Sequence, residues 1–268
     1  MSIYTIGDLH LSFSSEKPMD VFGDNWLGHS DKIKDNWINK ITQEDYVILL
    51  GDFSWAMYLE ESLKDFEFLD KLPGKKILIK GNHDYWWTTL KKMEMFLSDN
   101  NLNTISFLYN NSTMIEDKII VGTRGWNLSD TDNSEKMIKR ENNRLELSIL
   151  DGIKKYGNDK EIIAFIHYPP ITENNKNSIF VETMKKYGIN RCYYAHLHGN
   201  SHKDAIEGEY DNINYKLVSA DYLNFNVLKL WNYCKNKKIW YNLVVNFIFY
   251  IEKGMYKQNE SKRWKDRK

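Results

Sequence analysis

The sequence predicts an α/β fold whose core is two packed β-sheets, a β-sandwich flanked by helices. Short apolar runs that end in polar loops recur along the chain, and they indicate buried strands because they are β-branched or aromatic and bounded by Gly, Pro or Asn. Helical patterns separate the early runs, which predicts a parallel sheet in the first half of the chain. The second half is richer in strand-like runs, and these supply the second sheet.

The expected elements follow one another in a regular order. The strand-like runs lie at residues 3–10, 46–54, 76–84, 118–126, 162–170 and 191–199. One helix is expected at residues 60–72, where apolar residues fall near one face and Pro73-Gly74 provides a stop signal. A second helix is expected at 134–157, whose terminal glycine suits a C-cap. Residues 214–231 carry a further strand-like pattern that completes the core.

Composition limits the class of protein. The 268 residues are 42% hydrophobic and 28% charged, which is typical of a soluble globular protein. We expect one main domain at residues 1–231 and a C-terminal extension at 232–268. Lysines and arginines number 37, as do acidic residues, so no global positive field indicates nucleic acid as a partner. Two cysteines and a start without a basic signal region predict a cytoplasmic location.

Polar side chains of particular types gather where the predicted strands end. Ligands of open α/β sheets bind beyond the carboxyl ends of strands, so these residues are candidates for one shared site. The set comprises Asp8, His10, Asp52, Asn82, His83, His167, His196 and His198.

The chemistry of this set indicates metal binding. Asp8 and His10 are two residues apart, as are His196 and His198, and at the end of a strand this period lets both side chains point the same way. With Asp52, Asn82 and His167 they make seven nitrogen and oxygen ligands without a thiolate, which suits two divalent ions such as manganese, zinc or iron. We choose Asp52 as the bridge, because a carboxylate has two oxygens to share. A pair of cations lowers the pKa of a bridging water and polarises a phosphoester.

Five motifs in order carry a resemblance to a known family. "GDLH", "GD" at 51 and 52, "GNHD", His167 and "HLH" resemble the signature of the calcineurin-like metallophosphoesterases over residues 4 to about 200. The resemblance implies a four-layer fold and a binuclear metal centre. It also implies ligand sets, with Asp52 bridging: the first metal is held by Asp8, His10 and His198, and the second by Asn82, His167 and His196.

The same resemblance implies catalytic roles for two further residues. His83 would stand over the substrate oxygens, with Asp84 orienting it and favouring its protonated form. Ala195 departs from the glycine that the family usually has before the first histidine of its last motif. This departure leaves the pose of His196 open.

Other residues near the predicted loops allow two readings. Trp55, Trp86, Trp87 and Trp126 either pack the loops against the core or form a pocket wall for an aromatic or apolar leaving group. Arg124 is a candidate phosphate contact, with a structural ion pair as the alternative. Arg124 and Trp126 are thus candidate substrate-binding residues, whereas His29 and His202 are expected at the surface or in loops.

The sequence therefore predicts a phosphoester hydrolase that uses two-metal-activated hydroxide for in-line attack on a phosphomonoester or phosphodiester. One alternative is a catalytically idle scaffold that binds a protein partner. A second is a membrane-surface enzyme acting on lipid-linked phosphate, through the apolar residues 239–251 and the basic residues 252–268. The substrate, the preference for monoester or diester, the native metal and the oligomeric state are left open.

Overall fold

The computed structural model describes residues 1–15, 17–128 and 132–232. Met1–Trp231 form one compact unit. Most of the C-terminal extension, including residues 239–251 and 252–268 for which a membrane contact was considered, lies outside the described residues.

The first sheet is built from the N-terminal third of the chain and one late strand. Strands β1 to β4 pair in parallel in sequence order, which confirms the predicted parallel sheet. In spatial order the strands are β11 (Leu228–Asn232), β1 (Ser2–Ile6), β2 (Tyr46–Leu50), β3 (Lys75–Ile79) and β4 (Ile105–Phe107). The helices of this half are α1 (His29–Ile38), α2 (Leu63–Lys71) and α3 (Leu90–Asp99).

The second sheet is parallel in its centre and antiparallel at its two edges. In spatial order its strands are β5 (Thr113–Ile115), β6 (Lys118–Thr123), β7 (Glu161–Ile166), β8 (Arg191–Tyr194), β10 (Ile213–Leu217) and β9 (Gly208–Tyr210). Its helices are α4 (Asp132–Tyr156) and α5 (Ile179–Lys186).

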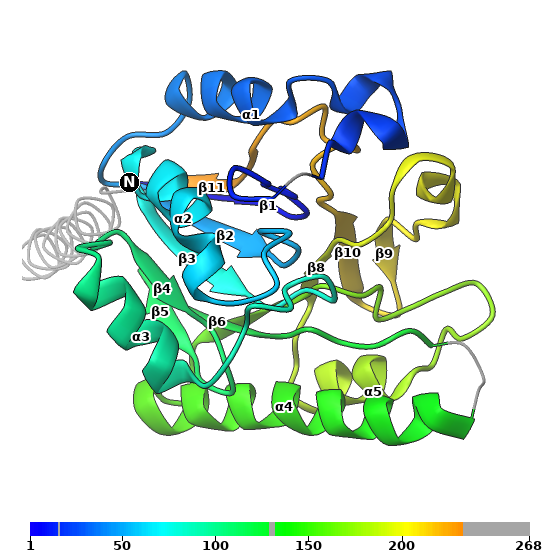
Figure 1. Cartoon of the computed structure of the whole chain (residues 1–268). Coiled ribbons are helices and arrows are strands. Elements are labelled where there is room, and N and C mark those ends of the chain that lie inside the picture. The colour runs from blue at the N-terminus through cyan, green and yellow to red at the C-terminus, as the bar shows by residue number, and fades with distance from the viewer. Residues whose placement is uncertain (16, 129–131, 233–268) are drawn as a thin grey trace, which may run out of the picture. The chain divides into compact units, whose positions relative to one another are not determined.

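Alternation along the strands creates the layers. In β2, Ile48 and Leu50 belong to the apolar cluster between the sheets, whereas Val47 and Leu49 pack in the cluster that includes α1, α2 and α3. Side chains of the second sheet also alternate between two clusters. One set joins the cluster between the sheets, and the other packs against α4 and α5 in a third cluster. Figure 1 shows α4 and α5 on one side of the sheets and α1 on the opposite side. The predicted sandwich flanked by helices is confirmed as four layers.

All six strand-like runs form strands, and each strand ends before the polar residues of its motif. Helices α1, α3 and α5 were not predicted. The described residues also include the short 3₁₀ helices η1 (Met19–Phe22), η2 (Asp24–Trp26), η3 (Glu60–Ser62) and η4 (Gly199–Asp204), of which η3 forms the first turn of the helix expected at residues 60–72. No helix in the described part of the chain has the length and apolarity needed to cross a bilayer.

Candidate metal centre

Asp8 and His10 lie beyond the end of β1, not within it. Both have left-handed backbones, with φ of 58° and 47°. Their amides donate to the carbonyls of Gly51 and Asp52 at 2.9 Å in each case, so the β1 loop is fixed to the β2 loop. Strand alternation is therefore not what brings Asp8 and His10 together; two strained residues at the strand end do so.

The loops after β2 and β3 approach each other closely. Gly51 and Asp52 are consecutive left-handed residues, with φ of 76° and 49°. A Cβ atom on Gly81 would overlap both the backbone nitrogen and the carboxylate of Asp52. Glycine at position 81 thus allows Asn82 and Asp52 to reach the same site.

The second sheet contributes the remaining candidate ligands. His167 follows β7 directly, and His196 and His198 follow β8. His196 is again left-handed, with φ of 74°, and its amide donates to Asp8 Oδ2 at 3.0 Å. The ligand set is therefore divided between the two sheets: residues 8 to 82 come from the first and residues 167 to 198 from the second.

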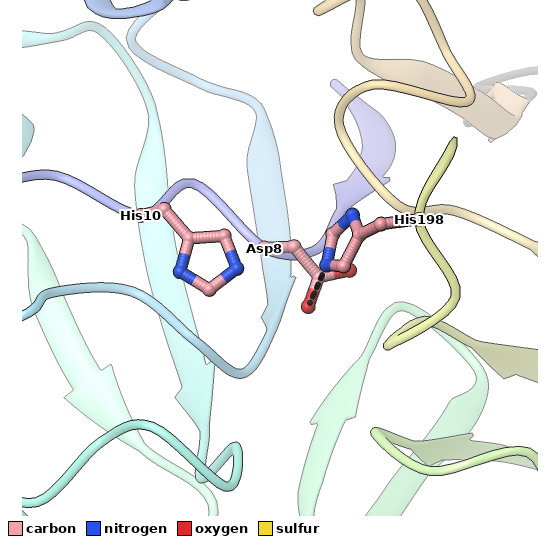
Figure 2. A group of neighbouring side chains, drawn as sticks. All are labelled: Asp8, His10 and His198. Carbon is pink, nitrogen blue, oxygen red and sulfur yellow. Dashed lines mark ion pairs between the residues drawn. The ribbon is translucent and has the colours of Figure 1, made fainter. Parts of the chain in front are cut away.

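The side chains converge in two neighbouring groups. In each group the possible ligand atoms lie within 4.8 Å of one another. The first group, drawn in Figure 2, is Asp8, His10 and His198, and the second is Asp52, His167 and His196.

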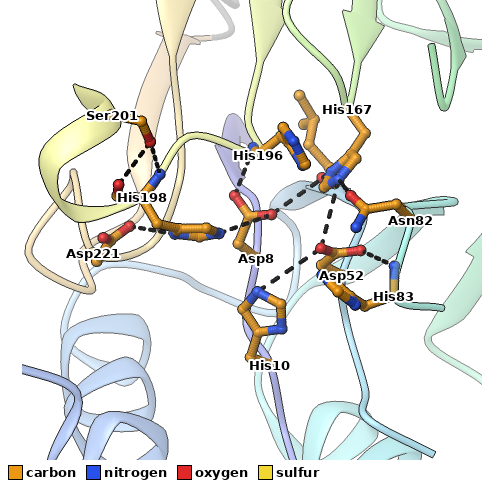
Figure 3. A network of polar contacts seen from close by, with 12 residues as sticks. Asp8, His10, Asp52, Asn82, His83, His167, His196, His198, Ser201 and Asp221 are labelled. Atoms are coloured by element: carbon orange, nitrogen blue, oxygen red, sulfur yellow. Dashed lines mark hydrogen bonds and ion pairs between the residues drawn. The ribbon is translucent and has the colours of Figure 1, made fainter. Parts of the chain in front are cut away.

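Asp52 lies between these two groups. Its Oδ2 atom is 3.8 Å from His10 Nε2 and 3.6 Å from His167 Nε2 (Figure 3). The amide oxygen of Asn82 is 2.7 Å from the same nitrogen of His167, so Asn82 joins the second group. The structure thus brings together all seven residues predicted as ligands.

Buried polar atoms without hydrogen-bond partners indicate that this site is suited to binding cations. Asp8 Oδ1 and His198 Nε2 are 3.7 Å apart, and neither has a hydrogen-bond partner among the described residues. Natural proteins rarely leave such buried atoms unpaired unless an ion or water satisfies them. The mixture of imidazole, carboxylate and amide without thiolate suits borderline divalent ions.

Burial and the neighbouring charges together shift the pKa values of the site. Burial acts to raise the pKa of Asp8, but the histidines around it outweigh burial and lower that pKa. Burial, aided by the charges of Asp84 and Asp8, raises the pKa of Asp52 to about 7, although His167 opposes this. Burial opposes protonation of His198, yet Asp8 and Asp221 raise its pKa to about 10. The centre is therefore a place where buried negative charge requires compensation.

Asp221 is a functional candidate that the sequence analysis missed. Its Oδ1 atom is 2.9 Å from His198 Nδ1, and its Oδ2 atom accepts the Gly199 amide at 3.0 Å. His202, expected as a surface or loop residue, is also 3.2 Å from this carboxylate. Asp221 follows β10 at the same sheet edge as the ligands, which is the signal that could have found it.

Asp84 and His83, which were expected to act together, have different surroundings in the structure. The Asp84 carboxylate is buried and accepts hydrogen bonds from the amides of Asp52, Phe53, Ser54 and Gly81 and from the Trp86 indole. The His83 ring is not among these donors, so the role of Asp84 in orienting His83 stays a prediction. Burial, with a smaller electrostatic contribution from His167, lowers the pKa of His83, which is opposite to the increased protonation that was expected.

His83 itself lies beside the centre. Its amide donates to Asp52 Oδ1 at 2.7 Å, and its Nδ1 atom has no hydrogen-bond partner among the described residues. The ring packs against Trp55 and lies 5.8 Å from the His10 ring. The His83 ring therefore lies beside the first ligand group.

Ala195 fits because of a glycine opposite it. Its methyl group is buried, and a Cβ atom placed on Gly7 would lie only 2.6 Å from it. Because residue 7 is a glycine and has no Cβ atom, the methyl group of Ala195 has room beside it. His196 keeps its backbone bond to Asp8.

The remaining predicted residues lie in different surroundings. Trp86 and Trp87 are buried in the core, as the packing interpretation expected, whereas Trp55 lines a cavity at the site. Arg124 pairs with buried Glu141 at 3.0 Å and stacks over Trp126 at 4.5 Å. The structural ion pair is therefore present, and a substrate contact by Arg124 or Trp126 stays a prediction.

Fold and site together define a class of protein: a two-sheet α/β sandwich with a binuclear metal-binding site at the carboxyl ends of its strands. A sequence profile of the calcineurin-like phosphoesterases matches residues 1–200, and the chain belongs to that family. Members of this family are usually metal-dependent phosphoesterases.

No curated protein matches the chain. Among solved structures, the protein of unknown function AQ665 from Aquifex aeolicus is similar, with 19% identity, a TM-score of 0.47, and coverage of 85% of this chain and 95% of that chain. TT1561 of Thermus thermophilus has 10% identity and a TM-score of 0.47, with coverage of 73% of this chain and 81% of that chain.

Proposed function

We propose that the protein hydrolyses a phosphomonoester or phosphodiester at two divalent ions, manganese, iron or zinc. The observation that supports this most directly is the position of Asp52, whose Oδ2 atom faces a histidine of each ligand group. Two closely spaced ions require a carboxylate that both can share, whereas a single ion needs no such bridge. When bound, such ions would activate a water for in-line attack and polarise the phosphoryl oxygens.

The protein's own residues supply position and proton control. The His83 ring lines the cavity that adjoins the first group, and its buried Nδ1 atom has no hydrogen-bond partner among the described residues. A hydrogen bond from this ring to the phosphoryl or leaving-group oxygen would stabilise developing charge there. Asp84 acts on the site indirectly, because it holds the Asp52 and Gly81 loops together. It is thus a positioning residue.

The two alternatives receive less support. A scaffold that binds only a protein partner has no need of a complete ligand set with unpaired buried atoms. The membrane-surface alternative depends on residues 239–268, which lie outside the described part of the chain. We therefore propose the phosphoester substrate itself as the principal partner.

The experiment compares Asp52→Asn with the exposed control Asp31→Asn. Both proteins are loaded with manganese, and metal content is measured beside hydrolysis of 4-nitrophenyl phosphate and bis(4-nitrophenyl) phosphate. Asp52→Asn should lose metal from both sites and lose turnover, because a bridging oxygen and a charge disappear together. Undiminished turnover by the parent protein after exhaustive chelation would defeat the proposal.

A second comparison separates metal binding from chemistry. His83→Ala should keep nearly two metals per chain yet lose roughly 10²–10⁴-fold in rate, the usual range for a proton donor or charge stabiliser. His198→Ala should lose metal from the first group instead. If His83→Ala loses metal and His198→Ala does not, the assigned roles are reversed.

A further inference from the structure

A cavity of about 330 Å³ adjoins the first ligand group. His10, His83 and His198 form the side that faces the candidate centre. The other residues that line the cavity include Met19, Phe22, Asn25, Trp26, Trp55 and Asn200. A group attached to a phosphoryl oxygen at the centre would have this space beside it.

The indole rings of Trp55 and Trp26 contact the imidazole rings of the first ligand group. The Trp55 ring is stacked on His10, with centroids 4.9 Å apart and planes 21° apart. Trp26 meets His198 edge-on at 5.7 Å and His10 at 5.8 Å. The part of the cavity wall next to the proposed phosphoryl position is therefore aromatic.

These indoles are held in place by their own neighbours. The Trp55 indole nitrogen donates to Met19 Sδ at 3.1 Å, and Trp26 packs edge-on against Phe225 at 5.2 Å. Both tryptophans are buried to at least 91%. A rigid aromatic wall of this kind binds flat rings at low entropic cost.

The rim offers polar groups that are not used by the fold. The side-chain amides of Asn25 and Asn200 make no hydrogen bond to another residue in the described part of the chain, and both residues are exposed. An amide offers a donor and an acceptor together, which matches the edge of a nucleobase. A wall made for an acyl chain would have no use for two such groups.

We propose that this cavity binds a planar aromatic group of the substrate, with a nucleobase as the ligand that its walls and rim fit best. The substrate class is then a nucleotide or another phosphoester that carries an aromatic ring. This inference rests on the proposed phosphoester hydrolysis. A volume near the lower end of the range for ligand pockets accommodates one ring system and its attached sugar, and it excludes a folded protein segment.

Calorimetric titration of the manganese-loaded protein tests the cavity without turnover. Phenylphosphonate and methylphosphonate have no ester bond to hydrolyse, and they differ by the ring. Stacking of a base on an aromatic side chain typically changes affinity by roughly 5- to 150-fold. We therefore expect phenylphosphonate to bind at least about fivefold more tightly than methylphosphonate. Equal affinities would overturn the inference.

Variants assign this preference to the cavity wall. Phe22 is 66% exposed, so Phe22→Ala can be made with little risk to the fold, and it should reduce the preference for the phenyl ring. Trp26→Leu keeps apolar volume, and it should reduce the preference further. Val21→Ala is the matched control, because Val21 lies on the same 3₁₀ helix, is 71% exposed and does not line the cavity. A preference unchanged in both cavity variants would overturn the inference.

Adenosine distinguishes the source of the ring and separates the two proposals. It carries no phosphate, so its binding depends on the cavity and not on the metals. Tighter binding of adenosine than of phenol, with loss in Asn25→Ala and Asn200→Ala, supports a nucleobase; the reverse order supports a simple aryl group. Failure of all phosphoester hydrolysis with adenosine still bound would defeat the proposed function and leave the cavity assignment standing.

Discussion

Asp221 Oδ1 lies 2.9 Å from Nδ1 of His198, on the ring edge opposite the unpartnered Nε2 atom that faces Asp8. This pairing fixes which nitrogen of His198 is available to a metal and orients the ring. Asp221 has a second set of contacts to Gly199 and His202, so its carboxylate is itself held.

Asp221→Ala should weaken metal binding at the first group by about 10- to 100-fold, the usual effect of losing a residue that orients a ligand. Metal titration followed by calorimetry measures this directly, without any assay of activity. The control is Asp204→Asn, an exposed acid on the neighbouring 3₁₀ helix. Equal metal affinities for Asp221→Ala and the parent protein would show that His198 needs no such support.

Asp84→Ala should lower the free energy of unfolding by about 3 kcal/mol or more, because several buried amides lose their acceptor together. Urea denaturation measures the change. The neighbouring Tyr85→Ala is the control, since Tyr85 is 54% exposed and should shift stability by no more than about 0.5 kcal/mol. An Asp84→Ala protein of parental stability with reduced turnover would instead support the role of orienting His83.

Gly7 and Ala195 should behave as a coupled pair. Gly7→Ala should destabilise strongly, because its Cβ atom meets that of Ala195 and is also 3.1 Å from the Leu50 carbonyl. Ala195→Gly should cost about 1 kcal/mol through a small void and added backbone freedom. The double variant should recover part of the loss, and a double-mutant cycle from urea denaturation checks this. Additive losses would mean that the two methyl positions do not share one space.

Lys76 should make stability depend on alkaline pH. It is fully buried in β3, where its ammonium group contacts the Asp70 and Leu72 carbonyls and lies 3.0 Å from Thr104 Oγ1. Burial lowers its pKa from 10.5 to about 8, so between these values the unfolded chain binds more protons than the folded protein. Stability should therefore rise as pH increases through this window.

The Lys76→Met variant isolates this effect from other groups that titrate at alkaline pH. The difference in unfolding free energy between parent and variant should change in the parent's favour by about 3 kcal/mol from pH 7 to pH 11. Urea denaturation at several pH values measures it. A difference that stays constant with pH would mean that the ammonium is charged throughout.

The sequence was sufficient for the strands and for the positions of the candidate ligands, because each strand-like run is followed directly by the polar residues of its motif. An apolar run such as residues 46–50 must be buried, and the polar residue that follows, Asp52, then lies at the sheet edge. The position of Asp52 at the sheet edge is fixed by its own strand, whichever way the two sheets pack. The same holds for Asp221, which was overlooked although it follows a strand.

Contacts that depend on irregular backbone could not be predicted. His83 and Asp84 are neighbours in sequence, yet the chain turns so that one faces the cavity and the other lies under the Asp52 loop. Met19, Phe22 and Trp26 come from two short 3₁₀ helices without apolar periodicity, so nothing in their pattern indicated a pocket wall. Side-chain direction in such segments is set by packing with distant residues such as Phe225.

The division of the ligands between the two sheets has a mechanical consequence. Ions bound by Asp8 and His198, or by Asp52 and His167, would tie together parts of the chain that otherwise meet through apolar packing. The ions would cross-link the two sheets, and the cross-links could be removed by chelation. At a free ion concentration about 1,000 times the dissociation constant, a bound ion stabilises the folded state by roughly 4 kcal/mol. The catalytic cofactor would then also be a structural one, and chelation would loosen the join between the halves of the protein as well as stop its chemistry.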